Sequence, residues 1–317
     1  MEGLIEALRW AGLSPDEGPT TDTPRGPYVQ SRRLELYERH AKRLLDSGKA
    51  YRCYCSKERL STLKDAHGNG KYDGQCRNLP SSHSTAGEPF VVRFRVPTSG
   101  TMRISDAVYG TLTSANRLLD DAVIIKSDVY PTYHFSSVVD DHLMGITTVM
   151  RGQEWLPSTP LHCLLYEAFG WEPPRFAHLP LLIRKDGAKL SKRQNDSFVE
   201  WYRKAGYLPP ALLNFVAYLG WTPRVRNEVM SLDEMSAKFA AGDVNRADAT
   251  VDLDKLDWFN RQHLIRISSD GTDKILEMVA DLRRCLDDSA GWSDEYLARC
   301  IRLLSVQRLC SPQNLMA

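Results

Sequence analysis

The stretch that decides the fold is Pro131-Thr-Tyr-His-Phe-Ser-Ser-Val-Val-Asp-Asp-His-Leu-Met-Gly-Ile-Thr-Thr-Val-Met-Arg-Gly-Gln-Glu-Trp155. Within it, residues 146–150 form a short β-branched run that is typical of a strand. Arg151 follows this strand directly. In an open parallel sheet the carboxyl ends of the strands face the ligand crevice. An arginine at that point suits a two-pronged clamp on a carboxylate, to which Tyr133 can add a hydroxyl.

Each of these residues also has a structural interpretation. Arg151 could form an internal salt bridge, and Tyr133 could be a core aromatic residue. Residues 136–142 fit the start of a helix or of a strand, and periodicity alone leaves both open. Glu154 and Trp155 have the chemistry to meet an amine, a ribose or a purine.

A second constellation is the basic loop Arg184-Lys-Asp-Gly-Ala-Lys-Leu-Ser-Lys-Arg193, which follows the apolar run 176–183. Asp186 and Gly187 predict a turn. The lysines can neutralise a polyphosphate, while Ser191 and backbone N–H groups donate hydrogen bonds to it. A solvated basic loop is the structural alternative.

The remaining pattern predicts an α/β body followed by a helical module. Helices are expected at 4–11, at 31–45, and at 159–169 with Ser158 as its cap and Gly170 at its end. Strands are expected at 90–96 and 123–126. After Pro209 the chain reads as helical, with segments at 210–219, 231–239, 254–266, 272–287 and 293–309.

Composition excludes several classes of protein. The 317 residues carry a net charge of +1 and are 42% hydrophobic, which is typical of a globular chain without a global basic field. Seven cysteines are too few for a disulfide scaffold and favour a reducing compartment. No apolar run is long enough to span a bilayer, so no membrane association is expected.

Taken together, these motifs resemble glutamyl-tRNA synthetase of the bacterial and mitochondrial type, a class I aminoacyl-tRNA synthetase. The resemblance rests on the 131–155 block and on Lys189-Leu-Ser-Lys-Arg193, which is similar to the second class I signature Lys-Met-Ser-Lys-Ser. It extends to Gly26-Pro-Tyr-Val-Gln-Ser-Arg-Arg, Ala50-Tyr-Arg-Cys-Tyr-Cys and Gly206-Tyr-Leu-Pro-Pro-Ala-Leu-Leu-Asn.

This resemblance implies ATP-dependent activation of L-glutamate to glutamyl-adenylate, followed by transfer to tRNA. ATP with Mg²⁺ is the implied cofactor, and tRNA(Glu) the implied partner, with tRNA(Gln) left open. By resemblance, Lys189, Ser191 and Lys192 are catalytic. The implied ATP-binding residues are Glu154, Lys189, Leu190, Ser191, Lys192 and Arg193, and the implied glutamate-binding residues are Tyr133, His134, Phe135, Ser136, Ser137 and Arg151.

The resemblance also implies a division of the chain. Residues 1–175 would be part of a Rossmann-like catalytic domain, with an acceptor-binding insertion at about 46–120. Residues 176–260 would hold the second signature and a stem-contact helical region, and 261–317 would begin a helical anticodon-binding domain. The family's opening Arg-Phe-Ala-Pro-Ser-Pro-Thr-Gly, His-x-Gly-His-like and Arg-Ile-Glu-Asp-Thr-Asp motifs do not occur in this sequence.

We therefore expect a truncated form that is weakly active or inactive alone, a monomer, and a mitochondrial matrix location, or a cytoplasmic one if the chain is bacterial. The alternative is a non-catalytic fragment that binds tRNA or a partner. A queuosine-glutamylating relative would lack an anticodon module, and a glutaminyl-tRNA synthetase would have a late β-barrel, so both fit less well.

Cys53, Cys55 and Cys76 resemble part of a zinc site that some family members carry. Asn78 stands at the fourth place and is a poor zinc ligand, so zinc is not expected; Tyr72, His67 or His83 are the substitutes available. The cations of the 31–45 helix could face the tRNA backbone or simply be solvated. They are Arg32, Arg33, Arg39, Lys42 and Arg43.

Overall fold

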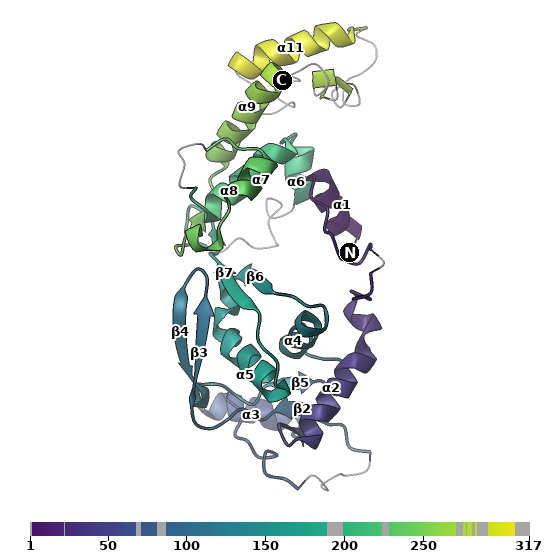
Figure 1. The fold of residues 1–317 in the computed structure, drawn as a ribbon, viewed down its shortest axis with the longest axis vertical. Coiled ribbons are helices and arrows are strands. Elements are labelled where there is room, and N and C mark those ends of the chain that lie inside the picture. Colours follow the sequence, from purple (N-terminus) through teal and green to yellow (C-terminus); the bar gives the residue numbers. More distant parts are fainter. Residues whose placement is uncertain are drawn as a thin grey trace. The chain divides into compact units, whose positions relative to one another are not determined.

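The computed structural model describes residues 2–21, 23–67, 71–80, 87–188, 199–223, 228–270, 275–276, 278–280, 283 and 291–307. The chain divides into two compact units. One comprises residues 15–178, and the other comprises residues 1–14 together with 179–317. Figure 1 shows the elements of both units.

The 15–178 unit contains two small sheets. In the first, β1 (Ala50–Cys53), β2 (Val91–Phe94) and β5 (Val123–Ile125) pair antiparallel in the order β1-β2-β5. The second has the order β4-β3-β7-β6, from β3 (Thr101–Asp106), β4 (Gly110–Ala115), β6 (Thr148–Gly152) and β7 (Arg175–Leu179). Strands β3 and β4 form an antiparallel hairpin, and β3 pairs parallel with β7 through Asp106 and Phe176.

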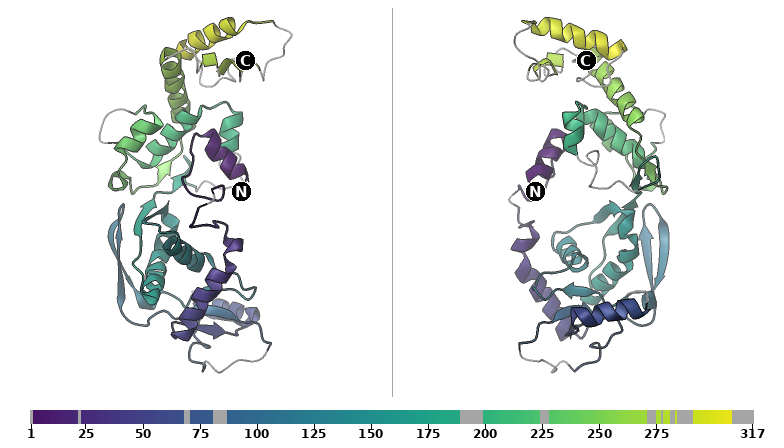
Figure 2. Two further views of the ribbon diagram at one scale, coloured as in Figure 1. Left: turned by 45° about the vertical axis from the view of Figure 1, so that its right-hand side comes forward. Right: turned by 180° about the vertical axis from the view of Figure 1, so that it is seen from behind.

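Three helices build the core of this unit: α2 (Leu34–Asp46), α4 (Tyr133–Leu143) and α5 (Thr159–Phe169). Helix α4 packs on α5, on α2 and on β5, and α5 also packs on β3, so that the hairpin lies beside α5 (Figure 2). The core is apolar because the inward faces of these elements carry large aliphatic and aromatic residues. Its largest fully buried members include Tyr37, Phe94, Phe135, Leu165 and Tyr166. The short elements η1 (Gln30–Arg32), α3 (Lys57–His67), η2 (Asn116–Leu118) and η3 (Gln153–Ser158) complete the unit.

Several expectations for this unit are confirmed. Helix α5 has the expected bounds, and Gly170 ends it with φ of 69°, a left-handed conformation that glycine adopts without a Cβ clash. The ambiguous segment 136–142 is helical, as part of α4. The expected strand at 146–150 is present but shifted, since β6 runs from Thr148 to Gly152 and includes Arg151.

Two local expectations are wrong. Ser158 does not cap α5, because its hydroxyl donates to the carbonyl of Trp155 at 2.8 Å. Arg33 is not on the solvated face of its helix. It is only 2% exposed, and its Nε donates to Asp140 on α4 at 2.8 Å, which excludes it from a tRNA-facing surface.

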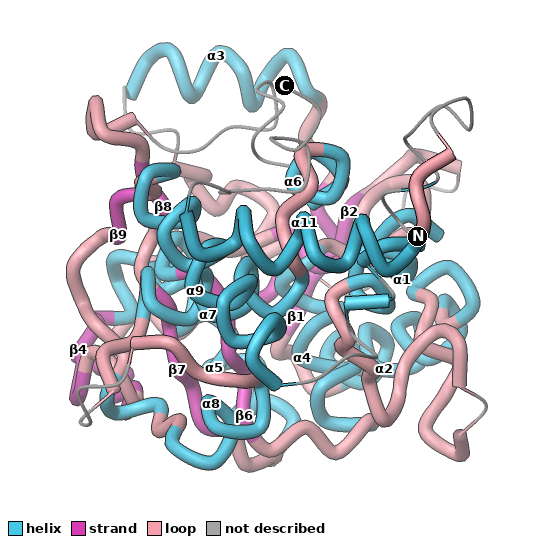
Figure 3. Tube along the Cα trace, turned by 90° about the horizontal axis from the view of Figure 1, so that it is seen from above, coloured by secondary structure: helices cyan, strands magenta, loops and turns pink. Residues whose placement is uncertain are grey.

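The second unit is mainly helical. Helix α1 (Glu2–Trp10) packs through Trp10 with α6 (Val199–Lys204), α7 (Pro209–Gly220) and α9 (Leu253–Asp270). Helices α7 and α9 pack against each other, and α11 (Asp294–Gln307) packs on α9 (Figure 3). Helix α8 (Leu232–Lys238) begins with a capping box between Ser231 and Glu234. Strands β8 (Leu182–Ile183) and β9 (Ala249–Thr250) pair parallel, and η5 (Ala241–Asp243) precedes β9.

The helical interpretation of the last third is confirmed for α7, α8, α9 and α11, while most of the expected 272–287 helix lies outside the described residues. The loop Lys189–Arg193 also lies outside them. The apolar run 176–183 lies in β7 and β8, which Pro180 and Leu181 separate. Among the described helices, none has the length and apolar character needed to cross a bilayer.

The buried pair between Arg33 and Asp140 makes a stability prediction. Replacing Asp140 by Ala leaves an uncompensated guanidinium in the interior, and also removes the acceptor of the Tyr37 hydroxyl at 2.7 Å. We expect Asp140→Ala to lower the free energy of unfolding in urea by about 3 kcal/mol. The matched control is Asp46→Ala, which breaks the exposed pair of Asp46 with Lys42 on α2 and should cost about 1 kcal/mol or less. Equal effects of the two variants would contradict the prediction.

Candidate functional site

The centre of the candidate site is the guanidinium of Arg151 on β6. Its Nε donates to His178 Nε2 at 3.1 Å, and its Nη2 donates to Thr159 Oγ1 at 2.9 Å. Its Nη1 lies 3.3 Å from His162 Nδ1. These partners come from β7 and from the first turn of α5, so the arginine is held at the junction of a sheet edge and a helix. Within the described part of the chain, three of its five N–H groups are engaged and two have no partner.

The hydrogen bonds that Arg151 donates determine which ring nitrogen of each neighbouring histidine carries the proton. An arginine can only donate, so the His178 and His162 nitrogens that face it must accept. His178 then carries its proton on Nδ1, where Asp106 Oδ2 accepts it at 2.6 Å. His162 carries its proton on Nε2 and donates it to His134 Nδ1 at 2.9 Å. A single chain of hydrogen bonds therefore runs from Asp106 to His134 through Arg151.

The histidines are neutral at pH 7. Burial lowers the pKa of His178, although Asp106 opposes this effect. Burial and the cation of Arg151 together lower the pKa of His162 to about 2 and also lower that of His134. No ion pair among the described residues involves Arg151. Its three hydrogen-bond partners are thus neutral acceptors, and none of them cancels its positive charge.

An aromatic wall stands beside this arginine. The ring of Tyr133 is 44% exposed, and its centroid lies 4.3 Å from that of Trp155. His134 contacts both rings. Both residues are connected to Arg151 through His162, which lies 2.9 Å from His134 Nδ1 and whose ring centroid is 6.2 Å from that of Tyr133.

The other predicted glutamate-binding residues lie differently. Phe135 is fully buried in the core, and Ser136 is 5% exposed with its hydroxyl on the carbonyl of Tyr133 at 3.3 Å. Their side chains face the interior and have no open path to a ligand. Ser137 is half-buried and donates to the carbonyl of His134 at 3.4 Å.

Glu154 follows β6 in the short helix η3, three residues after Arg151. Its carboxylate lies over the bare Cα of Gly152, in the space that a Cβ would fill, so only glycine leaves room for this conformation. Gln153 in the same helix receives the hydroxyl of Tyr109 from the β3–β4 turn. The remaining predicted ATP-binding residues, Lys189 to Arg193, lie outside the described part of the chain.

Asp141 is a second titratable group near this site. Burial and the neighbouring charge of Asp140 raise the pKa of its carboxyl to about 6, while Arg151 opposes the shift. A carboxyl with this pKa changes charge near neutral pH, which is common at functional sites.

A separate cluster gathers the three thiols of Cys53, Cys55 and Cys76 within 4.8 Å of one another. The Sγ atoms of Cys55 and Cys76 are 3.6 Å apart. The hydroxyl oxygen of Tyr72 lies 3.4 Å from Cys53 Sγ and 3.6 Å from Cys55 Sγ. A tetrahedral zinc ion with Zn–S bonds of about 2.3 Å would separate its sulfurs by about 3.8 Å, so the donors present fit such an ion.

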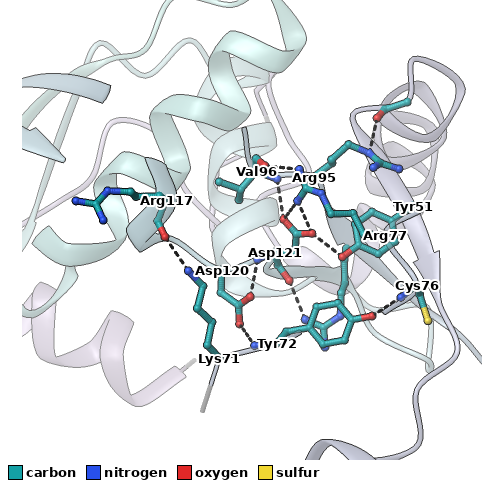
Figure 4. A network of polar contacts seen from close by, with 12 residues as sticks. Tyr51, Lys71, Tyr72, Cys76, Arg77, Arg95, Val96, Arg117, Asp120 and Asp121 are labelled. Atoms are coloured by element: carbon teal, nitrogen blue, oxygen red, sulfur yellow. Dashed lines mark hydrogen bonds and ion pairs between the residues drawn. The ribbon is translucent and has the colours of Figure 1, made fainter. Parts of the chain in front are cut away.

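A polar network supports this cluster, as Figure 4 shows. The backbone N–H of Cys76 donates to the Tyr72 hydroxyl at 2.9 Å, and the N–H of Tyr72 donates to Asp120 at 3.0 Å. Asp121 accepts from Tyr51 at 2.6 Å and from the guanidinium of Arg77. Two consecutive carboxylates therefore fix the loop that carries Tyr72 and Cys76.

The cluster also has a cation beside it. The guanidinium of Arg93 is 7% exposed and lies 3.9 Å from the centre of the Tyr72 ring. Burial raises the pKa of the Cys53 thiol, but hydrogen bonds from Tyr72, the Cys55 backbone and Arg93 outweigh it and leave that pKa below its ordinary value. Burial raises the pKa of Cys55 to about 11. Of the substitutes for Asn78 that the sequence offers, Tyr72 is the one placed at the thiols, while the side chains of His67 and His83 lie outside the described set.

Comparison with known proteins defines the class. The family model of the catalytic domain of class I tRNA synthetases (E and Q) matches residues 1–258. The chain belongs to this family. It has the family's mixed α/β architecture, with the Arg151 site at the edge of one sheet.

Within this family, the chain is most directly compared with individual glutamate–tRNA ligases. The chain is 44% identical over 296 residues to a glutamate–tRNA ligase of Clostridioides difficile, covering 88% of this chain and 59% of the relative. It is 41% identical over 308 residues to that of Thermus thermophilus, covering 96% and 64%. The chain thus spans about 60% of the length of these relatives.

Solved structures of glutamate–tRNA synthetases have a similar fold. The crystal structure of a glutamate–tRNA synthetase from Elizabethkingia anophelis matches with a TM-score of 0.86 at 34% identity, over 99% of this chain and 69% of that one. A glutamate–tRNA ligase from Elizabethkingia meningosepticum, in complex with its amino acid, gives a TM-score of 0.87 at 35% identity, over 99% and 68%.

Sequence reasoning missed four residues of the Arg151 network: Asp106, Thr159, His162 and His178. A signal was available for one of them, because His178 is a titratable residue inside an apolar strand and needs a buried partner. Its partner Asp106 is 72 residues away in the chain, and no local pattern connects the two.

The raised pKa of Asp141 predicts how the stability of the protein depends on pH. Its folded-state pKa lies above the ordinary value, so the protonated carboxyl stabilises the folded protein at low pH, and this contribution is lost as the pH rises through about 6. We expect Asp141→Asn to raise the free energy of unfolding at pH 7.5 by about 2 kcal/mol and to flatten its pH dependence between pH 4 and 7.

The control for this experiment is Asp128→Asn. The hydrogen bond from Lys126 lowers the pKa of Asp128, so its contribution has the opposite sign: it is present above the ordinary pKa and lost at acid pH. This variant should bring no gain at pH 7.5. If Asp141→Asn is no more stable than the parent in urea titrations at pH 7.5, burial does not raise the pKa of the Asp141 carboxyl in the folded protein.

Proposed function

We propose that the chain carries the amino-acid-binding part of a glutamate–tRNA ligase, which activates L-glutamate with ATP and transfers it to tRNA. The observation that carries the proposal is the guanidinium of Arg151, whose charge is left available by neutral partners. The family match and the names of the relatives support the same reaction.

In this proposal, Arg151 binds a carboxylate of glutamate with its two remaining N–H groups, and Tyr133 and His134 form the adjoining wall. Ser137 is placed on the same helix. Only a planar guanidinium presents two parallel donors to a carboxylate, which favours glutamate over its amide. Phe135 and Ser136 would act by packing α4 rather than by touching the ligand.

Glu154 would lie on the ATP side of the site. Residues Lys189, Leu190, Ser191, Lys192 and Arg193 are proposed as the loop that neutralises the phosphates, with Lys189, Ser191 and Lys192 taking part in catalysis. Mg²⁺ would enter with ATP and carry part of the developing phosphate charge. The chain's own contribution is to orient the glutamate carboxylate toward the α-phosphate.

The proposed nucleic-acid partner is tRNA(Glu), with tRNA(Gln) as a further acceptor. Residues 46–120 are proposed as the part that receives the acceptor end, within a catalytic region of 1–175. Residues 176–260 would contact the stem and 261–317 the anticodon arm. On α2, Arg39 is exposed and available to phosphates, whereas Lys42 pairs with Asp46 at 2.6 Å and Arg43 donates to the carbonyl of Phe169 at 2.8 Å. The relatives named above come from bacteria and give no support to a mitochondrial location.

The proposal is tested by isothermal titration of the chain with L-glutamate and with L-glutamine. We expect glutamate to bind more tightly, and Arg151→Gln to weaken its affinity by about tenfold or more, as expected for loss of a charge-assisted pair. Arg103→Gln, on the exposed face of β3, is the matched control and should leave the affinity unchanged. Equal affinity for the two amino acids, or an Arg151→Gln variant that binds like the parent, would overturn the assignment.

We also propose that Cys53, Cys55, Cys76 and the hydroxyl of Tyr72 hold a zinc ion. The converging donors support this, against the expectation drawn from Asn78. Bound zinc would join β1 to the loop after residue 71 and so stabilise the 15–178 unit. Arg93 would offset the negative charge of the thiolates.

Purified chain is therefore expected to contain about one zinc per molecule, since a site of this kind is a structural one. A strong chelator should release the metal and lower the midpoint of thermal unfolding, because the metal binds only the folded chain. Cys55→Ser should lose the zinc, whereas Cys300→Ser, outside the cluster, should keep it. A chain free of zinc after expression in zinc-supplemented medium would refute the site.

A further inference from the structure

His178 forms the link between Arg151 and a buried carboxylate. Its Nδ1 lies 2.6 Å from Asp106 Oδ2, and its Nε2 accepts from Arg151 Nε at 3.1 Å. The side chains of both His178 and Asp106 are fully buried. The imidazole therefore has Asp106 on one side and Arg151 on the other, and the hydroxyl of Thr159 also lies 3.2 Å from its Nε2.

Asp106 can only accept, and it is held rigidly. It ends β3, where its Oδ1 accepts from the backbone N–H groups of Val108 and Tyr109, both at 2.9 Å. These bonds close the β3–β4 turn and orient the second oxygen toward His178. The turn of the hairpin thus sets the direction of the carboxylate, and the carboxylate sets the tautomer of the imidazole.

The tautomer matters because the guanidinium of Arg151 can only donate hydrogen bonds, so His178 must accept. With the proton on Nδ1, His178 presents a lone pair to the arginine Nε–H. With the proton on Nε2, that N–H could donate only to the hydroxyl of Thr159 at 3.2 Å, and the arginine Nε–H would lose its acceptor. The imidazole also separates the charge of Asp106 from that of Arg151, whereas a direct carboxylate partner would neutralise the arginine.

We propose that His178 is a positioning residue of the amino-acid site, and that its Nδ1–H tautomer, imposed by Asp106, orients Arg151 to bind the carboxylate of L-glutamate. This inference rests on the proposed function. It adds that the turn of the β3–β4 hairpin, through Asp106, is part of the machinery that distinguishes glutamate from glutamine.

Two amide variants separate the two roles of the imidazole. In His178→Gln the side-chain oxygen can reach the place of Nε2 and still accept from Arg151. In His178→Asn the side-chain nitrogen takes the place of Nδ1 and still donates to Asp106, but the acceptor for Arg151 is lost. Each variant keeps one of the two bonds and serves as the folding control for the other.

A third variant reverses the tautomer without touching the histidine. In Asp106→Asn the amide oxygen can keep the two backbone N–H groups, which places the amide nitrogen against His178 Nδ1. That nitrogen donates, so the imidazole proton must move to Nε2, where it opposes Arg151.

The experiment measures L-glutamate and L-glutamine affinity by titration calorimetry, and the His178 tautomer by ¹⁵N NMR of histidine-labelled chain. We expect an Nδ1–H tautomer in the parent and Nε2–H in Asp106→Asn. We expect glutamate affinity to fall by about tenfold in His178→Asn and Asp106→Asn, the effect of one charge-assisted hydrogen bond, and by about threefold or less in His178→Gln. The preference for glutamate over glutamine should fall in the same two variants. The Asp106→Asn/His178→Asn double variant should bind glutamate no more weakly than whichever of the two single variants binds it more weakly.

An Nε2–H tautomer in the parent, or His178→Asn binding glutamate as tightly as His178→Gln, would overturn the inference. So would an Asp106→Asn variant that folds, shows the changed tautomer and keeps its affinity. Failure of the parent chain to bind glutamate would instead overturn the proposed function, and the tautomer readout would then still decide whether Asp106 controls His178.

Discussion

The 15–178 unit holds one guanidinium, that of Arg151, among neutral hydrogen-bond partners, and within the described residues no ion pair joins it to a carboxylate. Arg151 lies among buried groups, where an unsatisfied cation would be costly, yet an ion pair there would cancel the charge on which the proposed glutamate site relies. The chain meets both demands with neutral acceptors: two imidazole nitrogens and a threonine hydroxyl satisfy the N–H groups without cancelling the charge. Burial, together with the cation itself, keeps these imidazoles neutral.

The fold supplies these acceptors from separate elements. Strand β6 carries the arginine, β7 carries His178, and the first turn of α5 carries Thr159 and His162. Helix α5 also packs on β3, the strand that ends at Asp106. Hence the core that α4 and α5 build is the support of the site as well as of the unit. The Arg33–Asp140 pair performs a related task, since it joins the start of α2 to α4.

The sequence predicts most of the regular secondary structure but not the long-range partners of Arg151. The helices and strands that carry regular apolar patterns, such as α5 and β2, were accessible from local periodicity, and so was a strand at the position of β6, although its bounds were predicted two residues too early. The partners of Arg151 were not, because hydrogen bonds between residues tens of positions apart leave no local pattern. Arg33 misled for the same reason: a cation beside a helix looks solvated until its partner 107 residues later is known. The thiol cluster shows a further limit, since a tyrosine becomes a plausible metal ligand only when its hydroxyl is seen beside the sulfurs.

The most direct test of the central claim is a crystal structure of this chain soaked with L-glutamate. The account predicts a glutamate carboxylate within hydrogen-bond reach of the two remaining N–H groups of Arg151, beside the ring of Tyr133, with the contacts of Arg151 to His178, His162 and Thr159 unchanged. A glutamate bound elsewhere, or Arg151 paired with a carboxylate of the protein itself, would contradict it.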